Sequence, residues 1–361
     1  MIRGGMFGKV VLFLLLVLLP ITYFLQYAEY ILLFSIAILG LPALVYFANQ
    51  GQSKLGTAQP NKKALNAFLI YIAWMLLMLL NSAFSLTSFI RIVQILGCLF
   101  AYICGSSIKW ERKDFSFIQN IVKLILLVNF LIWISRGMPL QNFSFIIANP
   151  ATYASVLYCW MMFLQLKEQK KFNDWLFMLI GLILIYASSA RATLLAMLVF
   201  YAVVFYAKSA GKRKGKSHFT KTKLDAIIVC EIVVCIAFIL LYSEMGYSDF
   251  ANKINMLSHK YFGKNFYSGR QIIWHNLIEA IEARPLFGYG LNVLPSDIYD
   301  THLSAHNTFI QVALQTGITG LVLLINVIVK IFKRTTSRVS SWNAVIGIAA
   351  ISMTAFHDDT L

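Results

Sequence analysis

Residues 304–325 read SAHNTFIQVALQTGITGLVLLI and hold both a fold signal and a functional signal. From Thr308 onward the segment is predominantly apolar, and about 20 such residues are enough to cross ~30 Å of hydrocarbon as a helix. His306 and Asn307 stand at the start of this run. A membrane helix has no structural need for an imidazole at its end, so the pair is a candidate for chemistry.

The rest of the chain repeats the apolar pattern. Of its 361 residues, 59% are hydrophobic and only 13% are charged, whereas about 25% are charged in soluble proteins. We therefore expect an all-α, polytopic membrane helix bundle of about eleven spans. The predicted spans are 8–26, 29–49, 65–85, 88–107, 118–135, 150–166, 174–190, 192–208, 224–243, 306–329 and 341–357.

Charge predicts the orientation of these spans. The net charge is +16, and most of the 31 Lys and Arg residues fall in alternate short loops or in the N-terminal tail. Short basic loops stay in the cytoplasm, which places the N-terminus inside. The basic run at 208–223 is explained by this topological rule, in preference to binding of nucleic acid or anionic lipid. We expect no nucleic-acid partner.

Three regions follow from this topology. Residues 1–243 form a transmembrane bundle of about nine spans, 244–305 form one large extracytoplasmic loop, and 306–361 hold the C-terminal spans. Loops this long are usually functional or disordered. This loop is too rich in Ile, Leu, Phe, Tyr and Trp to be disordered.

Short amphipathic helices are predicted inside the loop, and one of them lies in residues 267–290, which read YSGRQIIWHNLIEAIEARPLFGYG. Ser268 and Gln271 fit a capping box. Apolar residues follow at helical spacing, Pro285 ends the helix, and GYG makes a tight return. Arg270 therefore lies in the first turn, where its guanidinium and the free N–H groups of a helix N-terminus together favour an anion.

Three basic side chains are predicted at the outer face. Arg191 lies in YASSARATLLAML (186–198), between two spans, and joins Arg270 and His306 on that side. Two arginines suit a diphosphate, which they bind bidentately and stabilise as a leaving group. A neutral imidazole suits a general base that takes a hydroxyl proton. Asn307 could orient a hydroxyl or cap the helix. Because arginines neutralise the leaving group, no metal or other cofactor is required.

Each of these residues also has a structural interpretation. Arg191 fits an interfacial arginine whose head reaches water, and Arg270 fits an ion pair with Glu279 or Glu282. A lone interfacial histidine such as His306 is more often structural than catalytic.

Gly317 and Gly320 are predicted as small residues at a helix-packing face. Four further basic residues, Arg91, Arg136, Arg284 and His302, are interpreted as interface anchors.

With these motifs, the sequence resembles the O-antigen ligase/O-antigen polymerase family of bacterial envelope proteins. The spacing of His306, Asn307, Gly317 and Gly320 is similar to that family's H-[N/S]-x9-G-x-x-G text. The SGR…W…P…GYG segment resembles its large outer loop, with Arg270 as the loop arginine, and SARATLLA resembles the site of its outer-face arginine. The resemblance covers roughly 180–325.

The resemblance implies a GT-C-like, metal-independent glycosyltransferase in the bacterial inner membrane, active on its extracytoplasmic face. The donor would be a glycan on undecaprenyl diphosphate, bound by Arg191 and Arg270, with His306 as base. Membrane lipids and other polysaccharide-assembly proteins are expected partners. Family members often have about twelve spans, one more than predicted here, so a final span is absent or the sequence is truncated.

Two enzymes of this family fit the sequence. A polymerase transfers the glycan to another lipid-linked repeat unit, and a ligase transfers it to a sugar of the lipid A core. The short chain and the outer loop favour the polymerase, whereas ARATLLA resembles some ligases. A transporter or flippase is a third hypothesis, but it predicts charged or broken helices at the midplane.

Overall fold

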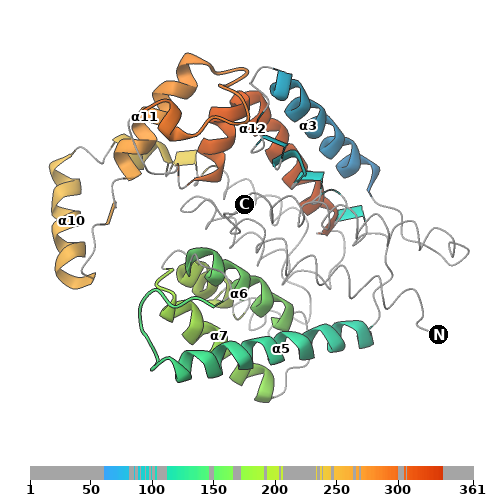
Figure 1. The fold of residues 1–361 in the computed structure, drawn as a ribbon, viewed down its shortest axis with the longest axis vertical. Coiled ribbons are helices and arrows are strands. Elements are labelled where there is room, and N and C mark those ends of the chain that lie inside the picture. Colours follow the sequence, from blue (N-terminus) through green and yellow to red (C-terminus); the bar gives the residue numbers. More distant parts are fainter. Residues whose placement is uncertain are drawn as a thin grey trace, which may run out of the picture.

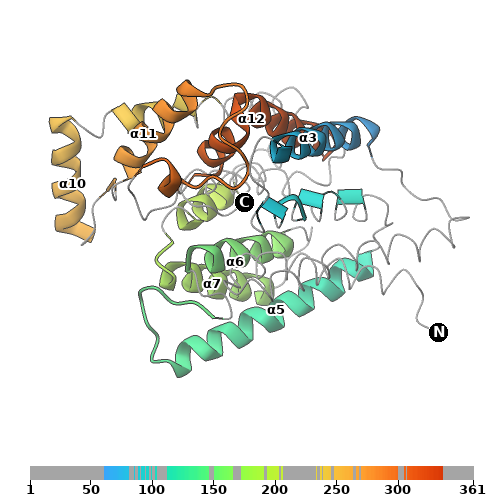
Figure 2. The ribbon, with the colours of Figure 1, turned by 45° about the horizontal axis from the view of Figure 1, so that its top comes forward.

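A computed structural model of the chain describes the middle of the sequence, with gaps. The described residues are 61–80, 85, 88–89, 91–93, 95–96, 99, 102–103, 112–145, 150–165, 172–190, 193–202, 205, 233, 236–237, 239–244, 248–262, 266–267, 270–299, 305 and 307–335. Every regular element within them is a helix, which agrees with the predicted all-α class. Figures 1 and 2 show two groups of packed helices, one on each side of the view's centre.

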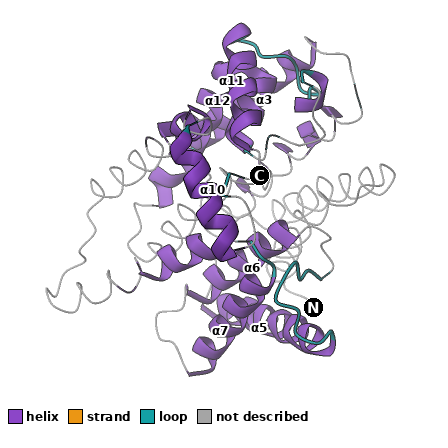
Figure 3. Ribbon diagram, turned by 90° about the vertical axis from the view of Figure 1, so that its left-hand side faces the viewer, coloured by secondary structure: helices purple, strands orange, loops and turns teal. Residues whose placement is uncertain are grey.

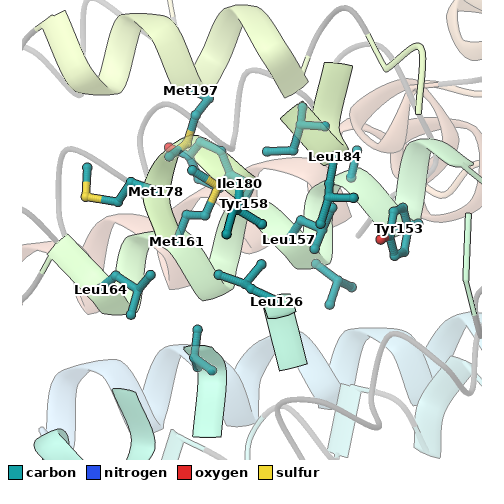
Figure 4. Close-up of a cluster of buried hydrophobic side chains, with 14 of the residues drawn as sticks. Leu126, Tyr153, Leu157, Tyr158, Met161, Leu164, Met178, Ile180, Leu184 and Met197 are labelled. Carbon is teal, nitrogen blue, oxygen red and sulfur yellow. The ribbon is translucent and has the colours of Figure 1, made fainter. Parts of the chain in front are cut away.

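The first group comprises α5 (Arg112–Ser135), α6 (Pro150–Gln165) and α7 (Phe172–Ala187), which pack on one another. We call it the α5–α7 body. Figure 4 shows its core, where side chains from all three helices and from the helical residues that follow α7 point toward one another. The labelled members are Leu126, Tyr153, Leu157, Tyr158, Met161, Leu164, Met178, Ile180, Leu184 and Met197.

Two polar contacts join the helices of the α5–α7 body. Lys123 of α5 forms an ion pair with Asp174 in the first turn of α7, and the Asp174 side chain is only 3% exposed. The Tyr153 hydroxyl of α6 donates to Asn129 Oδ1 of α5 at 2.9 Å. These buried polar side chains thus have partners on a neighbouring helix, as buried polar groups require.

The second group comprises α3 (Lys62–Leu80), α11 (Arg270–Ala283) and α12 (Thr308–Thr335), and we call it the α3–α12 body. Helix α12 packs along α3 and also contacts α11. The buried residues of α3, which include Phe68, Tyr71, Met75 and Met78, recur at intervals of three or four. This spacing puts them on one face of a helix, and that face meets α12.

The predicted outer loop, 244–305, contains α10 (Asp249–Phe262), α11 and a 3-10 turn, η1 (Pro295–Asp297). Figure 3 shows α10 as a separate helix in front of both groups, and Figure 1 shows it at one edge of the molecule. Its face with Ala251 and Ser258 is buried, whereas Phe250, Met256 and Leu257 are exposed. The region boundaries and the extracytoplasmic side stay predictions.

Three described helices are long and apolar enough to cross a membrane: Lys62–Leu80, Ser116–Ser135 and Thr308–Ile331. They correspond to the predicted spans 65–85, 118–135 and 306–329. Two shorter apolar helices, Asn173–Ala187 and Thr193–Ala202, match two more. The predicted spans 8–26, 29–49 and 341–357 lie outside the described residues, so the count of eleven stays a prediction.

Candidate functional site

The site begins at the N-terminus of α12, where Asn307 caps the helix. Its side chain is fully buried, and its Oδ1 accepts from the backbone N–H groups of Phe309 at 2.9 Å and Ile310 at 3.0 Å. These are donors that the first turn of a helix cannot satisfy internally. Of the two roles considered for Asn307, helix capping is the one that this geometry shows.

Helix α11 brings Arg270 toward that same end of α12. The backbone N–H of Arg270 donates to the Tyr267 carbonyl at 3.1 Å, and the helix begins there. Trp274 follows four residues later on the same face. Its buried indole Nε1 donates to the carbonyl of Ala305 at 2.8 Å. Ala305 immediately precedes His306, whose own placement lies outside the described residues.

Aromatic rings support the start of α11. The Tyr242 ring centroid lies 4.9 Å from that of Trp274 and 4.7 Å from that of Tyr267. The Tyr242 hydroxyl donates to the Tyr267 carbonyl at 2.9 Å. Apolar residues were expected at helical spacing along α11, but neither the Ala305 acceptor of Trp274 nor Tyr242 was identified. A buried tryptophan needs an acceptor for its N–H, and that requirement was the available signal for a partner of Trp274.

A tight turn at Ser188 and Ser189 follows α7, and Arg191, two residues further on, lies outside the described residues. Helix α7 ends at Ala187, and Ser189 adopts a left-handed φ of 59°. The loop after α5 holds this turn, because Phe143 N–H donates to the Ala187 carbonyl at 3.0 Å and Asn142 N–H to Ser189 Oγ at 3.2 Å. The predicted junction is therefore a turn, and its convergence with Arg270 stays a prediction.

Helix α12 is broken at Gly317, which has φ 71° and ψ 176°. In an unbroken helix, Ile318 N–H donates to the Leu314 carbonyl. Here Ile318 N–H donates to the Pro285 carbonyl at 2.7 Å, and the Leu314 carbonyl accepts from Tyr289 N–H at 2.9 Å. The sequence predicted one continuous span and a packing role for Gly317. Both expectations were incomplete, since the turn after α11 replaces the helix's own hydrogen bond.

Two more N–H groups donate to carbonyls beside the break. Gly290 N–H donates to the Gln315 carbonyl at 3.0 Å, and Trp74 Nε1 of α3 donates to the Thr316 carbonyl at 3.0 Å. A Cβ added at Gly320 would meet Trp74 Nε1 at 3.1 Å and the Thr316 side chain more closely still. Gly320 therefore lies at the contact between α12 and α3, as a helix-packing residue does.

Three polar side chains near the break were missed or given another role. Gln315, 3% exposed, accepts a hydrogen bond from the Arg91 guanidinium through its Oε1. Its Nε2 donates to the Val293 carbonyl at 2.8 Å, and Gln311 Nε2 donates to the same carbonyl at 3.1 Å. Arg91 thus contacts α12 within the protein. Two glutamines four residues apart in an apolar helix were the signal, because polar side chains there need partners.

Charged and phenolic side chains lie on the partly exposed side of α11 and next to it. Glu279, considered as a partner of Arg270, lies 3.5 Å from His275 Nε2, and Glu244 lies 3.7 Å from His275 Nδ1. Partial burial and then the Glu279 carboxylate raise the pKa of Tyr299. This phenol therefore stays neutral at physiological pH. The Arg284 guanidinium lies 4.6 Å from the Tyr289 ring centroid.

Residues 176–325 match the O-antigen ligase family. The chain carries an O-antigen ligase family domain. No curated protein matches the chain.

The O-antigen ligase domain contains most of α7, all of α10 and α11, and α12 as far as residue 325. Trp274, Ala305, Asn307 and the break at Gly317 all lie within it. Helices α3, α5 and α6 precede it in sequence, although α3 supplies Trp74 to the break. Members of the O-antigen ligase/polymerase family are glycosyltransferase-like membrane enzymes that act on lipid-linked glycans.

Proposed function

We propose that the protein is a membrane glycosyltransferase that polymerises undecaprenyl-diphosphate-linked oligosaccharide repeat units into a surface polysaccharide. The observation that carries this proposal is the hydrogen bond from Trp274 Nε1 to the Ala305 carbonyl. It brings the first turn of α11, with Arg270, to the segment that contains His306. A cation at a helix N-terminus suits the binding of a diphosphate, and a histidine next in sequence to Ala305 is a candidate base for transfer from it.

In the proposed reaction, Arg270 and Arg191 hold the diphosphate of the donor. The acceptor hydroxyl oxygen bonds to the anomeric carbon as the bond from that carbon to the diphosphate oxygen breaks. His306 takes the hydroxyl proton, and the arginines stabilise the charge on the departing lipid diphosphate. Asn307 fixes the end of α12 that carries His306, while Gly317 and Gly320 shape the helix.

The proposed site needs no divalent metal, because two guanidinium groups supply the positive charge. It lies at the extracytoplasmic face of the bacterial inner membrane, where the lipid-linked donor and membrane lipids meet. Other polysaccharide-assembly proteins are proposed partners. Treatment of the purified protein with EDTA should leave transfer unchanged, and a loss of activity that Mg²⁺ or Mn²⁺ restores would contradict this part of the proposal.

A ligase is the second candidate function, and the description of the matching family favours it. In that case the same site transfers the glycan to a sugar of the lipid A core. A flippase ranks below both enzymes: the break in α12 at Gly317 is a feature that a transporter also predicts, but the matching family is described as a ligase.

The deciding experiment compares a strain that lacks the gene with the same strain carrying a plasmid copy. Surface polysaccharide and undecaprenyl-linked glycans are analysed separately on gels. Surface glycan reduced to single repeat units indicates a polymerase. Long chains that accumulate on the lipid carrier and never reach the acceptor indicate a ligase. An unchanged pattern in both pools contradicts both proposals.

A further inference from the structure

The break in α12 is filled by main chain from another part of the protein. The segment after α11, residues 285–290, lies against residues 314–318 of α12 and exchanges three backbone hydrogen bonds with them, which we call the 285–290 turn contact. The donors and acceptors are Ile318 to Pro285 at 2.7 Å, Tyr289 to Leu314 at 2.9 Å and Gly290 to Gln315 at 3.0 Å. Backbone groups freed by a helix break inside a protein need such partners.

Two glycines make this approach possible. A Cβ on Gly317 would lie 2.2 Å from the Leu286 carbonyl oxygen, and a Cβ on Gly288 would lie 2.5 Å from the Leu314 carbonyl oxygen. Both obstacles are backbone atoms, which cannot rotate away as a side chain can. Both glycines also have positive φ, 71° and 65°, which other residues rarely adopt. Any side chain at either position therefore separates the two backbones.

The contact has a consequence for the site because α11 is bound to α12 at both of its ends. At the N-terminal end, Trp274 donates to Ala305. At the C-terminal end, the 285–290 turn follows α11 directly and fills the break. The part of α12 between these two ties, residues 308–316, carries the Asn307 cap and follows His306. Figures 1 and 2 both show α11 beside this end of α12.

We propose that Gly288 and Gly317 are positioning residues: by allowing the 285–290 turn contact, they set the direction of residues 308–316 and thereby the distance between His306 and Arg270. This inference rests on the proposed glycosyl transfer. Trp74 supports the same arrangement from α3 through its hydrogen bond to Thr316. A displacement of about 1 Å in reacting groups lowers rates about 10²-fold, so the geometry controls turnover more than donor binding.

The test measures kcat and the donor KM of full-length purified Gly288→Ala and Gly317→Ala proteins. The probe is the lipid-linked glycan extracted from the strain that lacks the gene. Gly137→Ala is the matched control, because Gly137 has φ 78° but nothing within 4 Å of an added Cβ. We expect kcat per folded protein to fall about 10²-fold in the two variants, with KM within about threefold. The control should match the parent.

A second pair of variants, with smaller structural changes, tests the same inference if the glycine variants misfold. Trp74→Phe removes the N–H donated to Thr316 while keeping a ring beside Phe287. Trp133→Phe is its control, since Trp133 Nε1 donates to the Pro139 carbonyl at 2.9 Å in the α5–α7 body. We expect Trp74→Phe to lower kcat roughly two- to tenfold and Trp133→Phe to leave it unchanged.

Hydrogen exchange provides a readout that is independent of transfer. In the parent, the amides of Tyr289, Gly290 and Ile318 should be protected, and the glycine variants should lose that protection. Folded variants that lose protection yet keep the parent's kcat overturn the positioning role and leave the proposed function intact. Equal losses of kcat in Trp74→Phe and Trp133→Phe also overturn it. A parent that transfers no glycan contradicts the proposed function, and the positioning role falls with it.

Discussion

The α5–α7 body and the α3–α12 body both bury apolar side chains, but among the described helices only the second body is also joined across a helix break. In the first, three unbroken helices bury large apolar side chains against one another, and Lys123 and Asp174 pair across the interface. In the second, backbone groups and indole N–H groups join helices across a break, at Pro285–Ile318, Trp74–Thr316 and Trp274–Ala305. The candidate site lies in the α3–α12 body, beside these contacts.

This difference indicates a division of labour. Side-chain packing tolerates small volume changes with a loss of stability, whereas a backbone contact through glycine tolerates no added carbon at all. The α3–α12 body therefore fixes geometry more strictly than the α5–α7 body. Changes in the former should lower the rate of transfer, and changes in the latter should lower the free energy of unfolding.

The largest effect is expected at the candidate catalytic group and the diphosphate site. His306→Ala and Arg270→Ala should lower kcat/KM by about 10²–10⁴-fold without lowering the amount of folded protein. His259→Ala, on α10, and Arg136→Ala, in the exposed loop after α5, are the matched controls. The measurement is glycan transfer per folded molecule. Full activity of His306→Ala would show that His306 is not the base, and that the α3–α12 body does not hold the catalytic group.

The next largest effect belongs to the α5–α7 body. Lys123→Met leaves the buried Asp174 carboxylate without its ion-pair partner, which should cost about 3–5 kcal/mol of unfolding free energy. Because this pair lies outside the proposed site, kcat per folded molecule should not change. Denaturant unfolding in detergent micelles measures the cost. The double change Lys123→Met with Asp174→Leu should recover most of the lost unfolding free energy. A lower kcat in the folded fraction of Lys123→Met would show that the α5–α7 body also affects transfer.

Trp274→Phe tests a contact in the α3–α12 body. It removes the donor to the buried Ala305 carbonyl, at a cost of about 1–3 kcal/mol for the unsatisfied acceptor. Since Ala305 precedes His306, transfer should slow by more than it does in Trp133→Phe, which loses an equivalent hydrogen bond at the end of α5. Thermal unfolding and kcat are measured on both proteins. Equal kcat values would show that the Trp274 bond is structural only.

The smallest effect is expected at His275, which lies between Glu244 and Glu279 on the partly exposed side of α11. Ion pairs of this kind contribute below about 1 kcal/mol. His275→Ala should therefore change stability by less than that amount, most visibly at low salt, and leave transfer intact. A tenfold loss of activity would extend the site to the outer side of α11.

Sequence patterns predicted the regular elements well. Long apolar runs identified α3, α5, α6, α7 and α12, although α5 begins six residues before the predicted start at 118 and α12 ends six residues after the predicted end at 329. The expected capping box of Ser268 and Gln271 placed Arg270 in the first turn of α11, where it lies. These features depend on residues that are close in sequence. The cap at Asn307 has the same local origin.

The break at Gly317 could not be predicted in this way. Small residues within an apolar helix are typical of helix packing, and only the contact with residues 285–290 turns Gly317 into a break. The pairing of Arg91 with Gln315 is equally non-local, because its partners are separated by 224 residues. Nothing near Arg91 in the sequence distinguishes it from an interface anchor.

The bond between Trp74 and Thr316 also constrains how the protein is made. Its partners are 242 residues apart in the chain. At a synthesis rate of about 5–20 residues per second, Thr316 emerges roughly 10–50 s after Trp74. Until Thr316 is made, the Trp74 indole N–H needs another hydrogen-bond partner. The arrangement around the break in α12 therefore cannot form before residue 316 has been synthesised, and the proposed glycan-transfer activity cannot appear earlier than that.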